Sequence, residues 1–145
     1  MSNNHTSEKI KILIAQLDSS VVSEITAGLQ SLIHLFHDTT IREDLGNTSQ
    51  KRLRKRLLRF LDKTPDHDTS GTLVINGIPY YLILEAAVLF PDENVEIRLR
   101  NLQKSTDPEI RVAVRLAFKK YPPGRSGIYG GTPRMGGRGT GLSDD

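Results

Sequence analysis

Apolar residues recur with helical spacing along most of the chain. In the segment from Val22 to Phe36, for example, the apolar side chains fall on one helical face. The segments with this spacing, which we expect to form helices, are 8–17, 22–36, a single turn over 40–46, 50–63, 79–90, 92–102 and 108–121. The pattern predicts an all-α domain over residues 8–121, preceded by a flexible N-terminus over residues 1–7.

The segment over residues 64–78 lacks this spacing, and two interpretations of it stay open. Asn76-Gly77, between Leu73-Val74-Ile75 and an apolar run, is typical of a β-hairpin turn. Pro79 argues against the hairpin, because proline lacks the N–H that a returning strand donates. Proline is equally suited to the first position of a helix. We favour an irregular loop that leads into a helix beginning at Pro79.

The C-terminal segment, from Pro122 to Asp145, is rich in glycine and contains three arginines and few apolar residues. Such a composition buries too little apolar surface to offset the entropy lost on ordering. It therefore predicts a disordered tail over residues 122–145. The Arg and Gly residues faintly resemble an RGG-type RNA-binding tail, but without its repetition.

One junction between predicted helices has a distinctive pattern, over Leu99 to Phe118. Two leucines end the first helix, and Asp107-Pro108 supplies an N-cap followed by proline at the first helical position. The second helix opens with Ile-Arg, and its small residues Ala113 and Ala117 let a neighbouring helix approach closely. This arrangement resembles the junction between two HEAT repeats.

The resemblance implies a short right-handed stack of antiparallel helix pairs, that is, a HEAT-like α-solenoid. Such repeats are roughly 40 residues long and about three are needed for a stable stack, which is what a domain over residues 8–121 can hold. The family consists of scaffolds and adaptors, with occasional nucleic-acid binders and lyase subunits. It does not specify a ligand, because a fold does not define a function.

The composition adds few constraints. Lys and Arg number 20 against 17 Asp and Glu, and the resulting net charge of +3 does not by itself indicate nucleic acid. Cysteine is absent, which excludes disulfides and thiolate chemistry and fits a reducing compartment. Met1 to Lys9 lack the apolar region of a secretory signal, and no apolar run reaches the ~20 residues of a membrane helix. We expect a cytoplasmic protein without a membrane span.

The helix expected over residues 50–63 is unusually basic. Its only acid is Asp62, and its basic residues are Lys51, Arg52, Arg54, Lys55, Arg56, Arg59 and Lys63. They cover most of the circumference outside a narrow apolar stripe that includes Leu53 and Leu57. Such a face can bind phosphates, an anionic membrane or an acidic partner helix. The alternative is a solvated face that pairs with carboxylates of neighbouring helices.

Two sets of oxygen or nitrogen ligands are weak metal candidates. Asp66, Asp68 and Ser70 have the spacing of the first half of an EF-hand loop, but Gly77 stands where a bidentate Glu is required. An Asp-rich turn is the alternative interpretation. His34, His37 and Asp38 are within reach of one zinc ion but lack a further strong ligand, and we expect His34 to border the core. We therefore expect no metal and no cofactor.

No set of catalytic residues emerges from the sequence. There is no cysteine, no Gly-x-Ser-x-Gly and no phosphate-binding glycine loop before a helix, so we expect a non-enzyme. HEAT-like stacks usually present protein-binding surfaces, and this favours a protein–protein interaction module or adaptor. The alternative is a protein that binds RNA or DNA through the basic helix over 50–63 together with the Gly/Arg tail.

Overall fold

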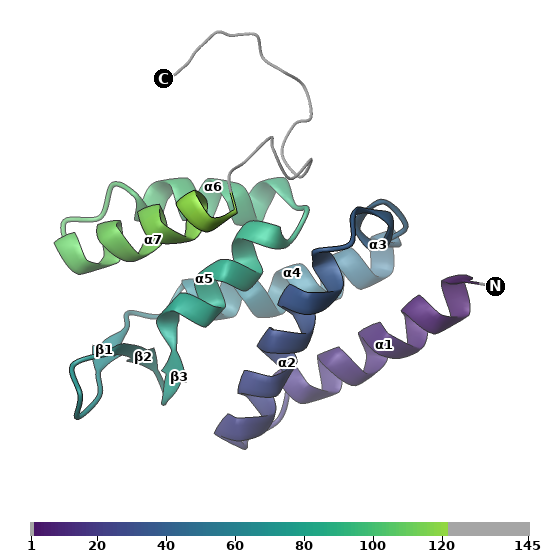
Figure 1. Ribbon diagram of the computed structural model, residues 1–145, viewed down its shortest axis with the longest axis horizontal. Coiled ribbons are helices and arrows are strands. Elements are labelled where there is room, and N and C mark those ends of the chain that lie inside the picture. Colours follow the sequence, from purple (N-terminus) through teal and green to yellow (C-terminus); the bar gives the residue numbers. More distant parts are fainter. Residues whose placement is uncertain (1, 122–145) are drawn as a thin grey trace, which may run out of the picture.

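The computed structural model describes residues 2–121, and this part of the chain is mostly helical (Figure 1). The helices are α1 (Ser2–Leu17), α2 (Val22–Phe36), α3 (Thr39–Glu43), α4 (Asn47–Leu61), α5 (Tyr80–Leu89), α6 (Glu93–Leu102) and α7 (Pro108–Lys120). Between α4 and α5 lie the short strands β1 (Asp66–His67), β2 (Leu73–Ile75) and β3 (Ile78–Pro79). The prediction of a mainly helical domain is confirmed, but the small sheet makes it not purely α.

The long helices lie in two rows (Figure 1). In one row α1 contacts α4 and α4 contacts α6, and in the other α2 contacts α5 and α5 contacts α7. Helices of the two rows also pack in pairs, α1 on α2, α4 on α5 and α6 on α7. The residues between 122 and 145, where the tail was expected, lie outside the described part of the chain.

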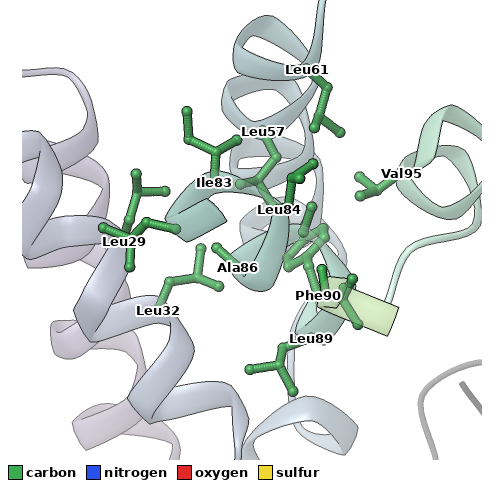
Figure 2. Packing of buried hydrophobic residues seen from close by; sticks show 14 of the residues in the cluster. Leu29, Leu32, Leu57, Leu61, Ile83, Leu84, Ala86, Leu89, Phe90 and Val95 are labelled. Carbon is green, nitrogen blue, oxygen red and sulfur yellow. The ribbon is translucent and has the colours of Figure 1, made fainter. Parts of the chain in front are cut away.

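Helix α5 is the centre of the core. Eight of its 10 residues are buried, because it contacts α2, α4, α6 and α7. Figure 2 shows side chains of several helices gathered around it, including Leu29 of α2, Leu57 of α4 and Val95 of α6. At the C-terminal end of α5 the rings of Phe36 and Phe90 stack, with their centroids 5.7 Å apart. A sequence that is apolar on most sides of this helix is therefore what its position requires, and of its residues only Tyr81 is exposed.

Helices α1 and α2 approach each other closely at Gly28. A Cβ atom on this residue would lie 2.9 Å from Cβ of Gln16 and 3.2 Å from Cδ2 of Leu17. Alanine at this position would therefore push the two helices apart. Helix α1 begins at Ser2, although the apolar spacing predicts a start at Glu8 after a flexible N-terminus. Apolar spacing cannot reveal helical turns that lack apolar residues.

Residues 66–79 form a three-stranded antiparallel sheet in the order β1-β2-β3. Ile75 pairs with Ile78 across a two-residue turn, in which Asn76 has φ 51° and Gly77 has φ 84°. Two positive φ values are the geometry that an Asn-Gly hairpin turn adopts. The loop favoured over residues 64–78 is wrong, and the alternative hairpin is confirmed. Pro79 is tolerated because it ends an edge strand of two residues, and helix α5 begins one residue later.

Tyr80 offers a test of the core. It is 1% exposed, and its hydroxyl has no hydrogen-bond partner among the described residues. Burial, together with the nearby Asp107, raises the pKa of Tyr80 to about 12, so the phenol is neutral. An unsatisfied buried hydroxyl costs about 1–3 kcal/mol. We therefore expect Tyr80→Phe to raise the free energy of unfolding by a similar amount, measured by urea denaturation. A loss of stability would contradict this account of the hydroxyl.

Candidate interaction surface on helix α4

Helix α4 spans Asn47–Leu61 and is held in place by one apolar face. Leu53 and Leu57 are fully buried and Leu61 is 2% exposed. Lys, Arg and Leu all have high helix propensity, so the basic composition is compatible with a helix of this length. The helix begins after Gly46, which occupies the N-cap without a side-chain hydrogen bond.

Arg54 belongs to an ion pair inside the fold. Its Nε lies 2.8 Å from Oδ2 of Asp92, and Gln50 Nε2 donates to the same oxygen at 2.9 Å. The side chain of Asp92 is only 2% exposed. Its other oxygen, Oδ1, accepts from the backbone N–H groups of Asn94 and Val95 and so caps α6. Arg54 therefore fixes α4 to the start of α6.

Arg56 forms the second internal ion pair. Its Nε and a terminal nitrogen donate to the two carboxylate oxygens of Asp18, at 2.8 and 2.7 Å. This hydrogen bonding is the main reason why the pKa of Asp18 is lowered, with smaller contributions from the charges of Arg59 and Arg52 and an opposing effect of burial. Arg56 therefore ties α4 to the C-terminal end of α1. For these two arginines the alternative interpretation, pairing with neighbouring helices, describes the structure.

The other five cations of the segment are all exposed, and we call them the basic row: Lys51, Arg52, Lys55, Arg59 and Lys63. None of them forms an ion pair with another residue of the described chain. The single acid of the segment, Asp62, is paired with Arg98 of α6. Three of the five, Lys51, Lys55 and Arg59, recur every four residues on α4 and span about 12 Å along it at 1.5 Å per residue, and Lys63 follows just beyond the end of the helix.

Charge repulsion within the basic row opposes the stability of its own helix. Like charges four residues apart destabilise a helix by about 0.2–0.5 kcal/mol per pair. Lys51, Lys55 and Arg59 stand at this spacing, and no carboxylate of the described chain compensates them within ion-pair distance. An anionic partner bound to the row would relieve this repulsion.

The calcium candidate adopts the geometry of an Asp-based turn. Oδ1 of Asp68 accepts hydrogen bonds from the backbone N–H groups of Ser70 and Thr72, each at 2.9 Å, and from the Ser70 hydroxyl at 2.8 Å. These bonds, that from the Ser70 hydroxyl first, lower the pKa of Asp68. Asp66 lies in strand β1. Within residues 2–121 no three His, Asp or Glu side chains come together as for a metal ion.

The three candidate zinc ligands have separate surroundings. His34 is exposed, so the expectation that it borders the core is wrong; it lies on α2 opposite the face that carries Leu29 and Leu32. His37 Nε2 lies 3.4 Å from the hydroxyl of Tyr121. Asp38 caps α3 by accepting from the backbone N–H of Thr40 at 2.9 Å.

Surface grooves were not foreseen. One, of about 480 Å³, lies between α1 and α2 and has Ile12, Gln16 and His34 in its lining. Another, of about 350 Å³, lies between β2 and α7 and includes Leu73 and Leu116. Their sequence signal is an apolar residue outside the buried stripe, since Ile12 is 60% exposed and Leu116 is 58% exposed.

Comparison with protein-family models, curated proteins and solved structures finds no match to this chain. Among the described helices, none combines the length and apolar character needed to cross a membrane. The Gly/Arg segment that could accompany the basic helix lies outside residues 2–121. The basic row is therefore the candidate functional surface within residues 2–121.

Proposed function

We propose that this protein is a non-catalytic interaction module, a short HEAT-like helix stack that binds a negatively charged partner protein through the basic row. The observation that carries the proposal is the row itself, in which five exposed cations have no ion-pair partner within the described chain. Two neighbouring arginines of the same helix are paired internally, so five of the seven cations of residues 50–63 are left for an external partner.

The HEAT-like part of the proposal is supported by the arrangement of the helices. Two rows of helices linked in pairs are what a right-handed stack of three antiparallel pairs requires. The junction residues also act as the resemblance implies. Asp107 accepts from the backbone N–H of Glu109 at 2.9 Å, and Pro108 opens α7. Ile110, Val114 and Phe118 are buried along one stripe of that helix.

The non-catalytic part is supported by the places where pKa values are shifted. Shifted pKa values often mark active sites. Here the pKa of Asp18 is shifted by its ion pair with Arg56, and that of Asp68 by the hydrogen bonds of a turn. The pKa of Tyr80 is shifted by burial in the core. Each of these three shifts therefore has a structural cause.

Binding of RNA or DNA is the second candidate, and the same row favours it, because cations along a helix can follow a phosphate backbone. The two candidates differ in what nuclease does to the complex. A partner protein stays bound after nuclease treatment, whereas material bridged by nucleic acid is released.

We expect the variant Lys51→Gln, Arg52→Gln, Lys55→Gln, Arg59→Gln to lose at least tenfold of its partner binding, because each change removes one contact charge. The control variant replaces four exposed cations elsewhere, Lys9, Lys104, Arg115 and Lys119, with Gln, and so has the same net charge. Arg56 is left in place, since it pairs with Asp18. Both variants are compared with wild type in pull-downs from native lysate, with and without nuclease.

The expected result is a nuclease-resistant partner that is retained by wild type and by the control and is lost from the row variant. Loss of the partner on nuclease treatment would replace the protein-binding proposal with nucleic-acid binding. Equal loss from both variants would show that net charge, and not the row, governs binding.

A further inference from the structure

The basic row repeats with a helical period, and this constrains the shape of its partner. Lys51, Lys55 and Arg59 follow one another on α4 at intervals of four residues, about 6 Å along the helix direction, and Lys63 lies just beyond the end of the helix. A partner helix with Asp or Glu at the same interval presents carboxylates about 6 Å apart. We propose that the basic row binds an acidic α-helix of the partner that lies along α4; this rests on the function proposed above.

The unpaired positive charge of the basic row is confined to the width of one helix. On the α1 side Asp18 pairs with Arg56, and on the α6 side Asp62 pairs with Arg98. These internal carboxylates partly neutralise the positive charge on the two sides of α4, so that most of it remains on the basic row between them. A basic row of this width matches a single partner helix better than it matches a broad anionic surface.

The exposed side chains of α4 do not provide what a membrane surface uses. The large exposed apolar residues of the described chain are Ile12, Val21, Val22, Tyr81, Ile97, Val112 and Leu116, and none of them lies on α4. Helices that lie in a membrane interface bury an apolar face there. The only apolar face of α4 faces the core, through Leu53, Leu57 and Leu61.

The surface is also poorly suited to nucleic acid. Binding of single strands relies on aromatic side chains that stack on bases, at about 1–3 kcal/mol per base. The one aromatic residue of α4, Phe60, is half-buried and packs against the core. A helix that reads a duplex enters its major groove. Helix α4 instead lies between α1 and α6 in the same row (Figure 1).

Two arginines of α4 already bind carboxylates within the fold. Arg56 holds both oxygens of a carboxylate at 2.8 and 2.7 Å, and Arg54 holds a second carboxylate at 2.8 Å. Hydrogen bonds between a guanidinium and a carboxylate are among the stronger ones in proteins. Arg52 and Arg59 would repeat these contacts with carboxylates of another chain, and the three lysines would add ammonium groups.

The test uses three labelled probes with the full-length protein. The first is an alanine-based helical peptide with five Glu residues, one at every fourth position. The second has the same composition with the Glu residues spread around the helix, and circular dichroism checks that both are equally helical. The third is a 20-base-pair DNA duplex. Binding is measured by fluorescence anisotropy at 0.15 M salt.

We expect the first peptide to bind wild type at least tenfold more tightly than the second. The variant Lys51→Gln, Lys55→Gln, Arg59→Gln, Lys63→Gln should lose this preference, and the four-cation control variant should keep it. Equal binding of the two peptides, lost in the row variant, would overturn the helical partner but leave an acidic protein partner standing. Tight binding of the duplex without binding of either peptide would overturn both proposals.

Discussion

Asp92→Ala is expected to lower the free energy of unfolding by about 3–5 kcal/mol, the cost of breaking a buried ion pair by removing one partner. The carboxylate accepts four hydrogen bonds, two of them from the backbone at the start of α6 and two from α4. Alanine leaves Arg54, Gln50 and two backbone N–H groups without this acceptor. The loss of the N-cap alone accounts for about 0.5–2 kcal/mol of the total.

The effect is measured by urea denaturation against a matched substitution in the same turn. Glu93→Ala removes an exposed carboxylate next to Asp92 and is expected to cost less than about 1 kcal/mol. Asp92→Asn keeps an oxygen for the cap but loses the charge, so it should fall between the two. If Asp92→Ala and Glu93→Ala had the same effect, the carboxylate would not be the joint between α4 and α6.

The buried faces of the helices could be predicted from the sequence because apolar spacing reports directly on burial. Leu29, Leu32 and Phe36 of α2 are all fully buried, as their spacing indicates. Spacing says less about where a helix begins. Helix α1 starts at Ser2 and α4 at Asn47, in polar turns where no apolar residue marks the boundary.

The hairpin could not be decided from the sequence because two local rules conflict there. Asn76-Gly77 favours a two-residue turn, whereas Pro79 disfavours the strand that follows it. The conflict is resolved by length. Strand β3 has two residues and lies at the edge of the sheet, so no further strand needs the N–H that Pro79 lacks.

The candidate site could be predicted only as a set of charges. All seven cations are visible in the sequence, but their partners are not. Asp18 and Asp92 are each 38 residues away from the arginine that they bind. Only the packing of α4 between α1 and α6 separates Arg54 and Arg56, which stabilise the fold, from the basic row.

Phe118→Ala is expected to lower the free energy of unfolding by about 3–5 kcal/mol, which is typical of removing a large aromatic side chain from a core. Phe118 is 7% exposed and shares its stripe on α7 with Val114, which is fully buried. Its ring is also covered by the guanidinium of Arg100, whose Cζ lies 4.7 Å from the ring centroid.

Leu116→Ala is the matched control, because Leu116 lies on the same helix but is 58% exposed. It is expected to change stability by less than about 0.5 kcal/mol. A cost below about 1 kcal/mol for Phe118→Ala would contradict the burial of this stripe. The unfolding of Phe118→Ala also tests whether the last helix pair of the proposed HEAT-like stack belongs to the core. A large cost in a single unfolding transition means that α7 unfolds together with α5 and α6, so that the last pair is part of one cooperative core.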